Sequence, residues 1–213
     1  MFTADAGGDA VAATRALGAV ATLLALGGIA AAILLDPTFS WTTDALSDLG
    51  VRDRSAPAFN WGLILGGAAG VGYALGLRCS SSEAGITDGA RAGVLALAMV
   101  AMAGVGVFDL TEPLHGPAAI GFYALITVVF AIDGLARRGT ATGRLALAFA
   151  PVHVAVWATF AAGWWPVSGL ALPELPGAFM LAAWVWVVGP LPVLSPGLGS
   201  SGSRRGDAGT DEH

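Results

Sequence analysis

Long apolar runs separated by short polar connections constrain this chain more than any other feature. Runs of roughly 17–25 apolar residues are the length that crosses the hydrocarbon core of a bilayer as a helix. The chain is 55% hydrophobic and 12% charged, whereas soluble domains carry about 25% charged residues. The sequence therefore predicts an all-α integral membrane bundle of six transmembrane helices. The predicted spans are residues 14–35, 59–77, 91–108, 117–136, 145–164 and 178–194.

The 213 residues suit one domain. We expect residues 1–13 to form a loose cytoplasmic tail, residues 14–194 the six-helix transmembrane domain, and residues 195–213 a disordered cytoplasmic tail. The first apolar run is too long for the core of a signal peptide, so it is predicted to be a retained helix.

The arginines predict the orientation in the cell membrane. Six spans place both termini on one side, and cytoplasmic connections carry the excess of basic residues. With the termini inside, eight arginines lie in the cytoplasm, and only Arg52 and Arg54 lie outside. The acidic residues then give the outer face a negative charge. They are Asp36, Asp44, Asp48, Asp53, Asp109, Glu112 and Glu174.

The longest polar interruption, residues 35–50, follows the first span. Its segment Thr43–Gly50 has the signals of a short amphipathic extracellular helix, with Thr43 as the N-cap and Gly50 at the end. At helical spacing Asp44, Ser47 and Asp48 share a polar face. The opposite face is apolar through Ala45, Leu46 and Leu49, so we expect this helix to lie on the membrane surface and cap the bundle.

Three stretches carry a family resemblance. They are Pro37–Gly50 with its Ala-Leu-Ser-Asp-Leu-Gly element, Phe59–Gly66, and Gly104–Phe108 with His115 a few residues later. Together they resemble domain-of-unknown-function family 998 (DUF998), multi-pass membrane proteins of archaea and bacteria. The resemblance covers about residues 14–194. It implies a membrane fold and brings no established activity and no catalytic residues.

Polar residues expected on the outer face form the first candidate site. Carboxylates with one imidazole are able to bind a divalent cation, or to act as acid and base on a lipid headgroup. We expect Asp48 to lie near the 108–115 loop, because both connections fold over the same end of the bundle. A solvated acidic surface with local helix caps is the alternative. The candidate ligand- or ion-binding residues are Asp44, Ser47, Asp48, Asp109 and His115, with Glu112 beside them.

Two further ionisable residues fall inside predicted spans. His153 lies near the middle of its span, two residues after Pro151. Ionisable groups at that depth are costly and mark functional sites by default. We therefore expect His153 to point into the bundle, where it serves a proton or substrate path or hydrogen-bonds a neighbouring helix. Asp133 has Arg137 four residues on, which predicts an interfacial ion pair that reaches toward the headgroups.

The sequence leaves the activity open, including whether the chain is an enzyme. The favoured hypothesis is a binding or structural membrane protein whose acidic outer cap recognises an ion, a lipid headgroup or a partner. The alternatives are a membrane-embedded hydrolase or transferase that uses Asp48, His115 and His153, and a small transporter that uses His153. Membrane lipids are the expected partners, with a protein partner or homo-oligomer through glycine-rich helix faces, and no cofactor or nucleic acid is expected.

Overall fold

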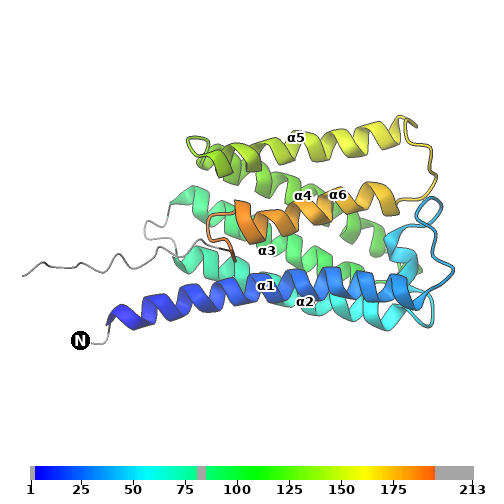
Figure 1. Ribbon diagram of the computed structural model, residues 1–213, viewed down its shortest axis with the longest axis horizontal. Helices are drawn as coiled ribbons and strands as arrows, with labels where there is room; N and C mark the ends of the chain where they lie inside the picture. The colour runs from blue at the N-terminus through cyan, green and yellow to red at the C-terminus, as the bar shows by residue number, and fades with distance from the viewer. Residues whose placement is uncertain (1–2, 81–84, 195–213) are drawn as a thin grey trace, which may run out of the picture.

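Six apolar helices lie side by side in the computed structural model of this protein, which describes residues 3–80 and 85–194 (Figure 1). They are α1 (Thr3–Leu35), α2 (Ala56–Ser80), α3 (Ile86–Val107), α4 (His115–Ala136), α5 (Ala141–Ala161) and α6 (Ala171–Ala183); a π-helical turn, η2 (Trp184–Val188), extends α6. Each is long and apolar enough to cross a membrane when η2 is counted with α6. Since the described residues contain no strand, the predicted all-α bundle of six membrane helices is confirmed.

Two helix starts lie furthest from their predicted positions. Helix α1 begins at Thr3, so the described part of the predicted N-terminal tail is helical and not loose. Helix α6 begins at Ala171, seven residues before the predicted start at 178, and it contains Pro173 and Pro176. Proline is tolerated in the first turn of a helix, where a backbone N–H lacks an acceptor within the helix, and this accounts for Pro173. Pro176 lies inside the helix. The predicted tail at 195–213 lies outside the described residues.

The helices follow one another through the bundle in chain order. Each helix from α1 to α5 packs against the next, and η2 contacts both α1 and α5 to close the bundle. One end carries the connections 36–55, 108–114 and 162–170, and we call it the cap end. Helix α1 begins and η2 ends at the opposite, terminal end (Figure 1).

Close glycine contacts place α2 between α1 and α3. A Cβ atom on Gly66 would lie 2.9 Å from the backbone oxygen of Ala21, and one on Gly67 would lie 2.6 Å from the backbone oxygen of Met99. The glycines at positions 62, 66 and 70 of the sequence, one at every fourth residue, predict a close approach to a neighbouring helix at Gly66. The structure confirms this prediction. These glycines of α2 pack against α1 and α3 of the same chain. Association of two copies through other glycine-rich faces stays a prediction.

A buried ion-pair network joins three elements near the terminal end. The Asp133 side chain is fully buried and accepts hydrogen bonds from Arg137 of α4, Arg91 of α3 (3.3 Å) and the indole N–H of Trp184 (2.7 Å). The predicted pair of Asp133 with Arg137 is thus present. The predicted reach toward the headgroups is wrong, because two guanidinium groups and an indole enclose the carboxylate within the bundle.

Candidate functional site

The cap, residues 36–55, is held together by one arginine. Arg52 donates to Asp36 at 2.7 Å and to Asp44 at 2.8 Å, and so it bridges the two ends of the loop. The Thr38 hydroxyl and then the Arg52 guanidinium lower the pKa of Asp36 from 3.8 to about 2. The pKa of Asp44 is also lowered, chiefly by the backbone N–H of Ser40 and then by Arg52. These two carboxylates are therefore engaged within the cap.

The predicted surface helix is shorter than expected. Only Leu46–Gly50 is helical, as the 3₁₀ helix η1, and Ala45 precedes it where Thr43 was predicted as the N-cap. Asp48 supplies the capping bond, since its Oδ2 accepts the Ala45 N–H at 2.7 Å. Leu46 and Leu49 are buried as predicted, while Ser47, predicted on the polar face, is also buried. The tighter winding of a 3₁₀ helix accounts for this change of face.

The other outer candidates are held by local bonds. Asp109 accepts the backbone N–H and the hydroxyl of Thr111, at 2.8 and 2.6 Å, and both contacts lower its pKa. His115 is buried and its Nδ1 lies 2.7 Å from the backbone oxygen of Phe108. In residues 3–80 and 85–194, no group of three His, Cys, Asp or Glu side chains is arranged to hold a metal ion.

The long-range hydrogen bonds of the cap run to the start of α6. The backbone oxygen of Thr42 accepts from both Ser168 and Gly169, and that of Asp44 accepts from Ala171, each at 2.9 Å. The backbone N–H of Leu46 donates to Oε2 of Glu174 at 2.8 Å. Across the described residues, hydrogen bonds thus join the cap to α6 and, through Gly50 and Asn60, to α2. None joins it to the 108–115 loop, near which Asp48 was expected.

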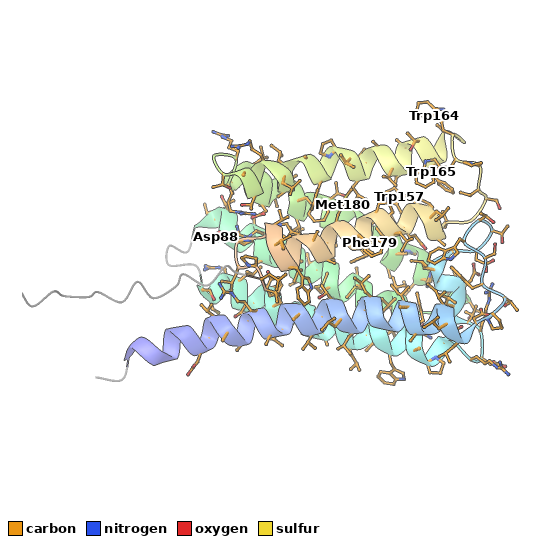
Figure 2. The ribbon with its side chains drawn as sticks, in the orientation of Figure 1. Asp88, Trp157, Trp164, Trp165, Phe179 and Met180 are labelled. Carbon is orange, nitrogen blue, oxygen red and sulfur yellow. The ribbon has the colours of Figure 1, made fainter. Side chains whose placement is uncertain are left out.

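A cavity of about 510 Å³ lies where α4, α5 and α6 approach one another in the half of the bundle nearer the cap. Its wall is apolar except for a few side chains. Its rim is exposed on the flank of the bundle, with Ile120 73% exposed on α4 and Val154 56% exposed on α5. Figure 2 shows Trp157 near the cap end, between the α5 and α6 ribbons. The polar or aromatic side chains that line the cavity are Tyr123, Thr127, His153, Trp157 and Glu174.

His153 points into the bundle, as predicted, and is 1% exposed. Its Nε2 accepts the indole N–H of Trp157 at 3.1 Å, and its Nδ1 lies 2.7 Å from the hydroxyl of Thr127. Because an indole nitrogen only donates, the neutral imidazole carries its proton on Nδ1 and donates it to Thr127. The Thr127 hydroxyl in turn donates to the backbone oxygen of Tyr123 at 2.8 Å. Both ring nitrogens are therefore satisfied in the neutral form.

Glu174 and Tyr123 stand between this cavity and a second one. The second cavity has a volume of about 90 Å³ in the core and is lined by α1, η1, α2, α3, α4 and α6. Both residues line both cavities. Glu174 is 7% exposed, and only its Oε2 has a hydrogen-bond partner among the described residues. The sequence placed Glu174 on the outer surface, which is wrong because α6 begins earlier than predicted.

A comparison with models of protein families identifies the family of this chain. The model of the family described as "Protein of unknown function (DUF998)" matches residues 19–190. The chain belongs to the DUF998 family. The searches among curated proteins and among solved structures found no match. The family expected from the sequence is confirmed, and its description assigns no activity. Together with the six apolar helices, the match supports a multi-pass membrane protein.

Five polar or aromatic residues line the cavity between α4, α5 and α6 of this DUF998 chain. The sequence predicted a functional role for only one of them, His153. The four-residue spacing between His153 and Trp157 was a usable signal, since such residues are neighbours on one helix face. Glu174 was obscured by Pro173 and Pro176 on either side, a pattern typical of a loop.

Proposed function

We propose that this DUF998 protein binds a lipid-like amphipathic molecule in the cavity between α4, α5 and α6. The apolar chain of the ligand would occupy the cavity, and its polar end would lie at Glu174 beneath the cap. The observation that carries the proposal is a cavity of about 510 Å³ with apolar walls and a few convergent polar groups. Ligand sites in proteins have this character and volumes of roughly 300–1,000 Å³.

The position of the rim supports a ligand that enters from the membrane. The exposed rim residues Ile120, Ala124, Val154 and Ala158 all lie on helices with the length and composition of membrane spans. A molecule that is already dissolved in lipid would therefore reach the cavity without crossing the cap.

We propose a role for the acidic cap that differs from the one expected from the sequence. Asp36 and Asp44 are paired with Arg52, and Asp48 caps η1. We therefore propose that the cap holds α6 in place and covers the polar end of the site. Recognition of the ligand would fall to Glu174, which the cap contacts through Leu46.

The proposed orientation places the cap end outside the cell membrane and both termini in the cytoplasm. The eight-to-two distribution of arginines supports this orientation. The ligand would then enter from the outer leaflet.

No specific observation favours the enzyme or the transporter hypothesis. Asp48 hydrogen-bonds with Ala45, and His115 with Phe108. His153 hydrogen-bonds with Thr127 and Trp157, so these contacts do not bring the three residues together in one catalytic group. The two hydrogen bonds of His153 hold the neutral ring, which supports a positioning role for this residue over proton transfer.

Photolabelling would test the site directly. A single-chain amphiphile with a photoactivatable group in its alkyl chain is added to the protein in lipid nanodiscs, and labelled peptides are mapped by mass spectrometry. We expect labels on residues 119–127 and 154–158. Ala158→Phe should reduce this labelling because a phenyl ring would fill the rim.

Ala155→Phe is the matched control, since Ala155 is also exposed on α5 but does not line the cavity. Even labelling of all lipid-facing helices, with equal results for the two variants, would overturn the proposal.

A further inference from the structure

Glu174 is a buried carboxyl group without a cationic partner. One of its oxygens accepts the Leu46 N–H, and no arginine or histidine within the described residues pairs with it. The side chain lines the cavity, so a ligand bound there would lie beside it. Burial of an acidic group without a counter-charge is costly, and a bound partner would offset this cost.

The electrostatic surroundings of Glu174 favour a cation over an anion. Asp48 accepts the N–H of Ala45, the residue next to Leu46, whose N–H Glu174 accepts. A second acid therefore lies near Glu174, although only Glu174 lines the cavity. A phosphate or carboxylate at the same place would be repelled by both acids in a medium of low dielectric constant. An ammonium group would instead be attracted to both.

Aromatic rings line the cavity beside Glu174. The Tyr123 and Trp157 rings lie with their centroids 5.2 Å apart, and both belong to the cavity wall. The negative face of an aromatic ring attracts ammonium groups, and proteins recognise choline-like cations with such aromatic walls. The combination of one buried acid and two rings is thus suited to a cationic end group.

We infer that the ligand of this cavity carries an ammonium group, which binds between Glu174 and the rings of Tyr123 and Trp157. This inference rests on the proposed function and specifies the polar end of the ligand. The ammonium could belong to a phospholipid headgroup or to a single-chain amine, and the chemistry that the site recognises is the same.

Head-group selectivity tests the inference. Three photoactivatable probes share one alkyl chain and carry a trimethylammonium, a phosphate or a glucoside head. With wild-type protein in nanodiscs, half-maximal labelling of residues 119–127 and 154–158 should need about tenfold less trimethylammonium probe than either other probe, because a buried charge pair supplies at least that factor. Competition by phosphatidylethanolamine or by a free alkylamine then distinguishes the two sources.

Glu174→Gln should remove the preference for the cationic probe and retain labelling by the glucoside. The amide oxygen of glutamine is still able to accept the Leu46 N–H, so the joint with the cap is preserved. Glu112→Gln is the matched control, because Glu112 is an exposed acid at the same end of the bundle and its loss changes the net charge equally.

The outcomes separate the two proposals. Equal labelling of the cavity by all three probes in wild-type protein would overturn the ammonium inference and leave the binding site intact. Absence of cavity labelling by every probe would overturn the binding site and the inference with it. Because the comparison of probes uses wild-type protein, the test does not depend on the folding of a variant.

Discussion

The backbone N–H of Leu46 donates to the carboxylate of Glu174 at 2.8 Å, which joins η1 of the cap to the first turn of α6. Helix α6 makes few close approaches to α4 and α1, and both cavities lie beside it. The bond between Leu46 and Glu174 therefore helps to hold α6 in position beside the two cavities.

Replacement of Glu174 by alanine should lower the melting temperature in detergent. The buried N–H of Leu46 would lose its acceptor, which costs about 1–3 kcal/mol. Glu174→Gln should lose much less, since its amide oxygen still accepts this bond. Equal losses for the two variants would contradict the assigned role of the Leu46 bond.

Asp133→Asn should destabilise the protein by about 3 kcal/mol or more, because Arg137 would lose its acidic partner and Arg91 would lose the buried one of its two acidic partners. Unfolding in a denaturing detergent measures the change. Asp88→Asn removes the other acid that contacts Arg91, but Asp88 is 29% exposed, so its loss should stay within about 1 kcal/mol. If both changes had similar effects, the buried network would not be a main support of the terminal end.

The cap should lose stability in acid. A carboxyl group whose pKa is lower in the folded than in the unfolded protein stabilises the fold above its unfolded pKa, and this contribution is lost as the pH falls through the folded pKa. For Asp36 that window runs from about 3.8 down to about 2, and Asp44 shifts in the same direction. Proteolysis of the 36–55 loop should therefore accelerate as the pH falls through this window, measured with an acid-active protease.

Arg52→Gln should make the loop sensitive to the protease already at neutral pH, because Arg52 bridges Asp36 and Asp44. Arg54→Gln provides the control, since Arg54 is exposed and forms no ion pair with the described residues. The same protease sensitivity in both variants would show that the net charge of the loop, and not the bridge, controls its order.

Gly66→Leu should lower the melting temperature, because a larger side chain would meet the backbone of α1 and overpacking costs about 1–3 kcal/mol. Gly93→Leu in α3 is the comparison, since a Cβ atom there meets nothing within 4 Å. An unchanged melting temperature for Gly66→Leu would place this face of α2 against lipid.

The sequence by itself determined the class of this protein, the number of its membrane helices and the close packing at Gly66. The length of an apolar run and the spacing of small residues can be read within one segment of the sequence. In a membrane, an apolar segment forms a helix because its backbone N–H and C=O groups must hydrogen-bond within the segment. The burial of Leu46 and Leu49 and the inward direction of His153 also followed from the sequence, because each depends on the apolar face or depth of one segment.

Tertiary structure decided which polar groups come together. Asp133 meets Arg91 across 42 positions, and Leu46 meets Glu174 across 128. The prolines on either side of Glu174 are typical of a loop. In the structure they belong to α6, and Glu174 is buried where the cap packs on the start of this helix. Pairings of this kind depend on how the helices and the cap pack in three dimensions, and a pattern within one segment carries no information about them.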